Sequence, residues 1–292
     1  VLSGFAALVY QTAWTRQFGL VFGTSELAVA TVLAAYMAGL ALGAWIIERL
    51  LPRVARPVLA YAGLELGIAI SAVVLVPALV AGSRALLVAW FGGQAAPPSS
   101  EQVGLSFFYL AGAFVALVLP TTLMGATLPL LARHAVHDRE QIGRRIGLLY
   151  ASNTAGAVAG ALATAFWLLP ALGLSRSIWV GAAVNVAVFL LAALLVQRTG
   201  VTPPAAAPGR ATAAPAATTP ARRWFPPALP PDPAWILPLM LLAGAVSFLH
   251  EVLWTRMLSQ IVGSSIYAFG VMLGSFLGGI ALGGAAGAWI AR

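Results

Sequence analysis

The sequence predicts an all-α, polytopic integral membrane protein, a bundle of about eight transmembrane helices arranged as six plus two. Three observations predict this class. Of 292 residues, 61% are hydrophobic and 8% are charged, whereas soluble domains carry roughly 25% charged residues. The apolar residues also come in runs of about twenty, the length that a helix needs to cross ~30 Å of hydrocarbon. Finally, the beginning of the chain is repeated near its end.

Polar or Arg-bearing breaks separate the apolar runs. The eight expected spans are 1–22, 28–47, 58–81, 105–132, 146–169, 178–196, 235–258 and 266–291. A ninth run, 85–91, is too short to cross a bilayer, and we expect it at the membrane interface or in a loop.

The distribution of arginine predicts the orientation. With eight spans, one side receives Arg16, Arg84, Arg176 and Arg256, and the other receives the remaining arginines, at 49, 53, 56, 133, 139, 144, 145, 198, 210, 222, 223 and 292. The positive-inside rule places the richer side in the cytoplasm. Arg in place of all Lys, together with the Ala content, is typical of a GC-rich genome, and we expect a bacterial inner membrane. Because the net charge of +8 is spread over these breaks, no nucleic-acid partner is expected.

The segment 197–233 differs from the rest of the chain. It is rich in Ala and Thr and holds ten prolines between Pro203 and Pro233, which disfavours both helix and sheet. We therefore divide the chain into a six-helix membrane domain (1–196), a cytoplasmic linker (197–233) and a helix pair (234–292). Val1 opens inside an apolar run without a charged stretch before it, so we expect a piece of a longer chain and not a cleaved signal peptide.

The helix pair after the linker repeats the first pair without gaps at an offset of 240 residues. Ser3–Ala44 matches Ala243–Gly284, and the shared residues include a W-T-R triplet at Trp14 and Trp254 and a G-x-S at Gly23 and Gly263. The second copy begins six spans after the first, so both have the same orientation, as in the parallel repeats of transporter halves. We expect the second half to be incomplete in this sequence.

Three motifs carry a resemblance to a known family: S-G-F-A-A-L-V-Y-Q-T-A-W-T-R from Ser3, P-T-T-L-M-G-A-T-L-P-L-L-A-R from Pro120, and G-L-L-Y-A-S-N-T-A-G-A-V-A-G-A-L from Gly147. In this order they resemble the membrane domain of spermidine synthase-like membrane proteins, often labelled fused major-facilitator/spermidine synthase proteins. The resemblance implies a major-facilitator-like bundle and a polyamine-like cargo. Family members commonly have Tyr-Glu before W-x-R, whereas this chain reads Tyr10-Gln11 and His250-Glu251.

The resemblance also implies a soluble aminopropyltransferase-like domain after the helices in full-length relatives. This sequence has neither a Gly-rich loop after a strand nor clustered carboxylates for a polycation, so we expect neither synthase activity nor a cofactor. No metal site is expected, because Cys is absent and the nearby pair His134 and His137 offers too few ligands.

Glu251 is the strongest functional candidate, because an acid inside an apolar run is costly unless it meets a cavity or a partner. It predicts a cation or proton site between the repeats or, alternatively, an ion pair with Arg16. Glu65, one turn after Tyr61, predicts either a pair with a loop arginine or a place on a transport path. The other polar candidates, for ligand contact, inter-repeat contact or interfacial anchoring, are Tyr10, Gln11, Arg16, Asn153, His250 and Arg256.

Small residues and prolines predict how the helices pack. Three G-x-x-x-G spacings predict close helix contacts, at Gly39 and Gly43, Gly156 and Gly160, and Gly279 and Gly283. Pro120 and Pro129 bracket Gly125, so we expect the fourth helix to kink or break there.

Two functions remain open from the sequence. One is a non-catalytic membrane module that transports or gates a small cationic metabolite. The other is an accessory transmembrane subunit that packs, besides the lipid bilayer, against other membrane subunits or a second copy of itself. A polar cavity lined by Glu251, Tyr10 and Asn153 would favour transport.

Overall fold

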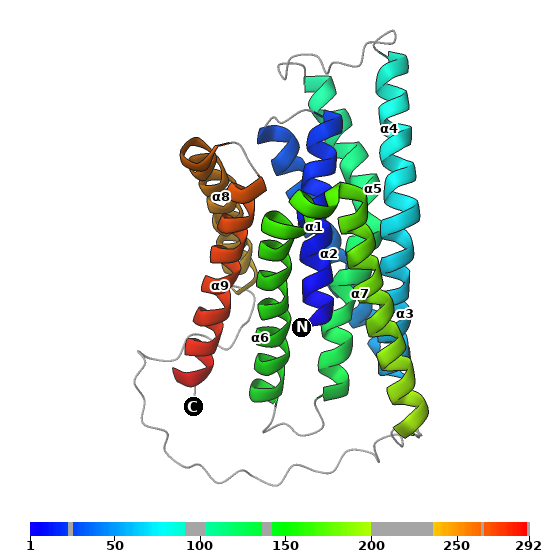
Figure 1. Ribbon diagram of the computed structural model, residues 1–292. Helices are drawn as coiled ribbons and strands as arrows, with labels where there is room; N and C mark the ends of the chain where they lie inside the picture. Colours follow the sequence, from blue (N-terminus) through cyan, green and yellow to red (C-terminus); the bar gives the residue numbers. More distant parts are fainter. Residues whose placement is uncertain (23–25, 91–102, 136–141, 200–235, 264–265, 291–292) are drawn as a thin grey trace.

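The computed structural model describes residues 1–22, 26–90, 103–135, 142–199, 236–263 and 266–290. Within these ranges the chain forms helices and no strand, which confirms the all-α prediction. The elements, in chain order, are α1 (Leu2–Phe22), α2 (Glu26–Leu50), η1 (Leu51–Arg53), α3 (Pro57–Ile70), η2 (Ser71–Leu75), α4 (Val76–Trp90), α5 (Val103–Ala135), α6 (Ile142–Ala163), η4 (Thr164–Leu168), α7 (Leu169–Thr199), α8 (Ile236–Val262) and α9 (Ile266–Ile290). They stand side by side as a bundle (Figure 1).

Six helical stretches of the described residues are long and apolar enough to cross a membrane. They are compatible with a multi-pass membrane protein. One of them, Arg145–Arg198, has 54 residues, or about 80 Å at 1.5 Å per residue. It bends where Gly173 adopts φ 75° and ψ 179°, a conformation largely restricted to glycine, and α7 then runs back beside the other helices (Figure 1).

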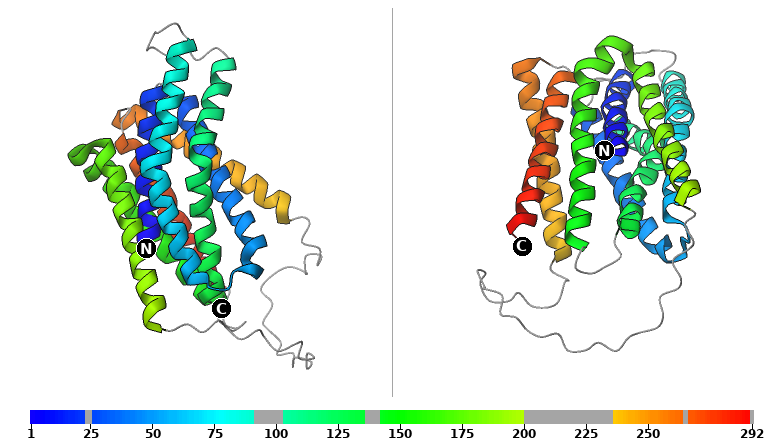
Figure 2. Two further views of the ribbon diagram at one scale, coloured as in Figure 1. Left: turned by 90° about the vertical axis from the view of Figure 1, so that its right-hand side faces the viewer. Right: turned by 60° about the horizontal axis from the view of Figure 1, so that its bottom comes forward.

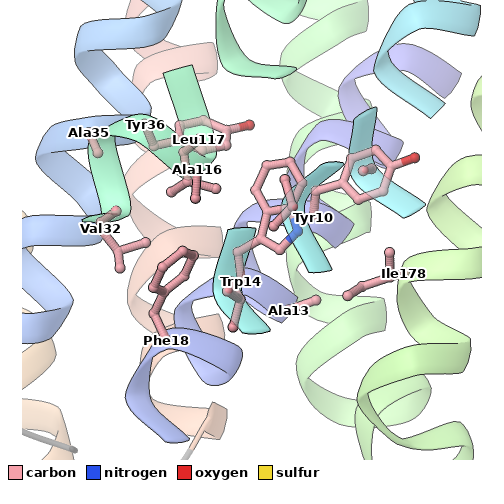
Figure 3. Close-up of a cluster of buried hydrophobic side chains, with 14 of the residues drawn as sticks. Tyr10, Ala13, Trp14, Phe18, Val32, Ala35, Tyr36, Ala116, Leu117 and Ile178 are labelled. Carbon is pink, nitrogen blue, oxygen red and sulfur yellow. The ribbon is translucent and has the colours of Figure 1, made fainter. Parts of the chain in front are cut away.

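α1 is not among the six stretches. Gln11, Arg16 and Gln17 lie within it and lower its hydropathy. Yet it is the helix that the rest of the bundle surrounds. It packs against α2, α6 and α7, and Tyr10, Trp14 and Phe18 on it are fully buried in the largest apolar cluster of the described residues (Figure 3).

The structure corrects three local expectations. Residues 85–90 continue α4, so they are neither a separate interfacial segment nor a loop. α5 runs without interruption from Val103 to Ala135 through Pro120 and Pro129, so of the expected kink or break the break does not occur. α7 extends to Thr199, past the expected start of the linker, and the rest of that linker lies outside the described residues.

Gly125 has a packing role in α5 instead. A Cβ at this position would collide with the backbone of Leu40 on α2, and α2 and α5 form the most extensive helix pair of the described chain. Membrane helices tolerate proline where neighbouring helices and hydroxyl side chains compensate for the missing hydrogen bond. Thr121 and Thr127 donate hydrogen bonds to Leu117 O and Met124 O, the carbonyls next to those of Ala116 and Gly125, which lose their amide donors to the two prolines.

The glycine pairs lie in different surroundings. A Cβ at Gly39 or Gly43 would collide with Thr121 or Thr122 of α5, and one at Gly156 or Gly160 would collide with Val1 or Phe5 of α1. In contrast, a Cβ added at Gly279 or Gly283 of α9 would meet no heavy atom of the described residues within 4 Å.

α8 and α9 stand beside the α6 side of the bundle (Figures 1 and 2). α9 packs on α6, whereas α8 contacts mainly α9, and most of its side chains are exposed. Trp254 shows the contrast with the first copy of the repeat, because it is 46% exposed whereas Trp14, its equivalent, is 0% exposed.

Candidate functional site

A cavity of about 340 Å³ lies between the two copies of the repeated helix pair. Its walls contain three pairs of residues that are equivalent at the 240-residue offset: Gln11 with Glu251, Tyr36 with Phe276, and Met37 with Leu277. The cavity is thus lined by corresponding positions of α1 and α8 and of α2 and α9.

Residues with polar side chains line this cavity from six different helices. They are Gln11 (α1), Tyr36 (α2), Thr127 (α5), Asn153 (α6), Asn185 (α7) and Glu251 (α8), and Ser3 adds a second polar side chain from α1. The remaining lining is largely aliphatic and aromatic. Glu251 is the one charged group among the described residues of the lining.

Glu251 is 2% exposed. Its Oε1 atom is buried and has no hydrogen-bond partner within the described chain. The alternative expectation, an ion pair with Arg16, is not observed: no such pair lies within 4 Å, and Arg16 is exposed. A buried carboxylate with an unpartnered oxygen, on a residue of a cavity wall, is suited to bind a positively charged group.

Gln11 is also 2% exposed, and its Nε2 atom has no acceptor among the described residues. The lining residues therefore include an unpaired donor on Gln11 and an unpaired acceptor on Glu251. Tyr36 is held in place by donating to Ala7 O at 3.1 Å, which ties α2 to α1. Asn153 is half-buried and packs against Gly4 of α1, where a Cβ would meet its backbone oxygen.

A second buried acid, Glu65 on α3, is 0% exposed. Asn185 Nδ2 on α7 donates a hydrogen bond to Glu65 Oε2, so its partner is an amide and not the expected loop arginine. Tyr61 and Ser3 also lie beside the carboxyl group. Glu65 Oε1 and Asn185 Oδ1 remain without partners in the described part of the protein.

Glu65 lies close to the walls of two cavities. Asn185 and Ser3 line the central cavity, and Ser3 and Tyr61 line a second cavity of about 530 Å³ that also contacts His134 at the end of α5. We call this second space the vestibule. His137, the second histidine of this stretch of sequence, lies outside the described residues.

Four candidates from the sequence lie away from the central cavity. Tyr10 stacks on Trp14 with ring centroids 5.2 Å apart, and its hydroxyl has no partner among the described residues. His250 is exposed and packs edge-on against Trp254 at 5.5 Å. Arg16 and Arg256 are both exposed, near the ends of their helices.

Asn185 is a site residue that the sequence motifs did not single out. It is the single polar side chain in the apolar run 178–196, and that isolation was the available signal, because a lone amide in hydrocarbon requires a hydrogen-bond partner. Among the described residues, no three His, Asp or Glu side chains gather as a metal-binding group. Comparisons of the chain with protein-family models, with curated proteins and with solved structures find no match.

Proposed function

We propose that this chain is a transport or gating module for a small organic cation, bound in the central cavity with its positive charge against Glu251. The proposal rests on one observation: Gln11 and Glu251 occupy equivalent positions of the repeat, and both line the central cavity. Two equivalent positions of a parallel repeat face one space, and parallel-repeat transporters place their substrate sites between the repeats.

The lining favours a cation over other cargo. Glu251 provides a buried negative charge, and the oxygens of Asn153 and Asn185 add acceptors for N–H groups. The aromatic rings of Tyr36 and Phe276 can attract a cation through their π faces. A volume of about 340 Å³ is at the small end of metabolite pockets, which span roughly 300–1,000 Å³.

The lining also favours a single positive charge. Tight binding of a polycation needs several carboxylates, whereas the described walls supply Glu251 alone. A cargo with one ammonium or guanidinium group therefore matches the charge of the site better than a polyamine does. The polyamine alternative rests on the resemblance of the sequence motifs.

The proposal also includes the family of the chain, its membrane and its topology. The chain would be the non-catalytic membrane module of a spermidine synthase-like membrane protein in a bacterial inner membrane. It would cross the membrane eight times, with the Pro-rich linker in the cytoplasm. The turn at Gly173 supports this count, because it divides the 54-residue stretch into two arms.

The test is uptake into liposomes that contain the purified chain. Radiolabelled guanidinium, tetraethylammonium and spermidine serve as probes, and we expect at least one singly charged probe to enter faster than spermidine. Glu251→Gln should abolish this uptake, because it removes the charge and keeps the shape. Glu48→Gln is the matched control, since Glu48 is exposed at the end of α2. Unchanged uptake in Glu251→Gln would exclude the assigned role.

A specific observation favours a second function, an accessory membrane subunit. The positions Gly279 and Gly283 face open space in the described chain, whereas their equivalents Gly39 and Gly43 are packed by α5. A helix of another subunit fits such a face. Purification separates the two functions, because a transporter should be isolated alone or as a homodimer, and an accessory subunit with partners in fixed stoichiometry.

A further inference from the structure

We propose that Glu65 is a second ion site, which holds a proton, and that its proton exchanges in step with the cation at Glu251. The proton site stands on the geometry around Glu65. Its coupling to a cation rests on the proposed transport function. Together they make the chain a cation–proton exchanger.

Glu65 is buried among uncharged side chains. Its carboxyl is 0% exposed, and the side chains that contact it in the described chain, Asn185, Tyr61 and Ser3, are uncharged. A carboxylate at this depth without a cationic side chain in contact is costly, and a bound proton removes the cost.

The groups around Glu65 favour a proton as the ion that it binds. Tyr61 lies on the same helix, and Tyr10 and the amino group of Val1 interact with Glu65 electrostatically from the α1 side. α7 supplies the uncharged Asn185, and α5 supplies His134 only at the vestibule. The hydrogen bond from Asn185 occupies Glu65 Oε2 and leaves Oε1 open, so the proton belongs on Oε1.

Glu65 contacts residues that line both spaces. Asn185 joins it to the central cavity, and Tyr61 and Ser3 join it to the vestibule. A proton leaving the buried Oε1 passes the hydroxyl groups of Tyr61 and Ser3 to reach water in the vestibule, and it leaves a carboxylate that still accepts from Asn185. The same proton returns by the reverse step, so the exchange needs no other reactant.

Asn185 links Glu65 to the cavity that contains Glu251. Asn185 lines the central cavity together with Glu251, and its Oδ1 has no partner in the described chain. A cation on Glu251 that donates an N–H to Asn185 Oδ1 changes the amide that holds Glu65. Asn185 is therefore a positioning residue that reports the occupancy of one site to the other.

Two measurements on the full chain test the proposal. Infrared spectroscopy of purified Glu251→Gln protein at neutral pH reports the carbonyl band of a protonated buried carboxylic acid without a contribution from Glu251, which is also buried. We expect this band in Glu251→Gln; the further change Glu48→Gln should keep it, and the further change Glu65→Gln should remove it. If the band is absent from Glu251→Gln, or survives the further change Glu65→Gln, the proton site is wrong, whatever the protein transports.

Liposome assays with radiolabelled guanidinium test the coupling. Glu65→Gln should keep the exchange of internal for external guanidinium within about twofold and lose proton-driven accumulation by roughly tenfold or more. Glu251→Gln should lose both. If Glu65→Gln still accumulates guanidinium, the coupling is overturned while transport stands. If the wild type exchanges no guanidinium and no other probe, the transport function and the coupling fail together, and the infrared band still decides the proton site.

Discussion

Gln11 on α1 and Glu251 on α8 occupy equivalent positions of the internal repeat, 240 residues apart, and both line one cavity with an unpaired polar atom. Gln11 offers a donor and Glu251 an acceptor. The two side chains have nearly the same shape and differ in charge. The two copies of the repeat therefore differ in charge where both line the cavity.

Moving the carboxylate between these positions should preserve function. We expect the double variant Gln11→Glu with Glu251→Gln to regain cation uptake that Glu251→Gln alone lacks, because the negative charge returns to the same cavity. Uptake of radiolabelled guanidinium into liposomes measures it. No recovery in a folded double variant would show that the surroundings of Glu251, and not the charge alone, are required.

Alanine at equivalent glycines should separate the packed face from the open one. Gly43→Ala places a Cβ against the backbone of Thr122 and Ala126, and we expect a loss of roughly 1–3 kcal/mol, as for other overpacked contacts. Gly283→Ala is the matched variant and should be neutral or slightly stabilising, because alanine favours helix over glycine by ~1 kcal/mol. Thermal unfolding in detergent compares them, and equal losses would mean that another helix covers Gly283.

Trp14 and Trp254, which are equivalent in the repeat, should also differ in how much they stabilise the fold. Trp14→Ala empties a fully buried site that stacks on Tyr10, which typically costs about 3–5 kcal/mol. Trp254→Ala should cost much less, since that side chain is 46% exposed. The difference in unfolding free energy between the two variants checks this, and similar values would contradict the environments described for α1 and α8.

Gly173 should tolerate no side chain. Its φ of 75° with ψ 179° lies in a region where other residues are strained by about 1–3 kcal/mol. Gly173→Ala should therefore lower the unfolding temperature, although no described atom lies within 4 Å of the added Cβ. Gly63→Ala is the control, because Gly63 has equal space within helical α3, and this variant should be neutral or slightly more stable.

The eight-span topology has a direct test, because the chain contains no cysteine. In intact cells, a membrane-impermeant maleimide should label Ser175→Cys, which is close to the bend at Gly173. It should leave Thr212→Cys in the linker unlabelled until the cells are opened. Labelling of both from outside would reject the proposed orientation or the number of spans.

Several of these features follow from the sequence, for physical reasons. Apolar runs of about twenty residues predicted the helices, since period and composition are local properties, and the isolated acid Glu251 stood out because hydrocarbon does not tolerate it. The partners of such groups are not local. Asn185 lies 120 residues from Glu65, and only the packing of α7 on α3 brings the two together.

The proline-rich fourth helix shows the opposite case. Local rules predicted a kink or a break at Pro120, Gly125 and Pro129, but α5 does not break there, and Gly125 fits closely against the backbone of Leu40 on α2. The chain bends at Gly173. Composition does not distinguish this glycine from the others among the thirty in the chain.

The polar composition of α1 has a consequence for biogenesis. Gln11, Arg16 and Gln17 make this helix a poor substrate for insertion by itself, because polar and charged residues within a span oppose partitioning from the translocon into lipid. Its contacts with α6 and α7 can form only after those later helices have been synthesised. We therefore expect α1 to wait beside the translocon for its neighbours, so that the innermost helix of the bundle becomes one of the last to be settled in the membrane.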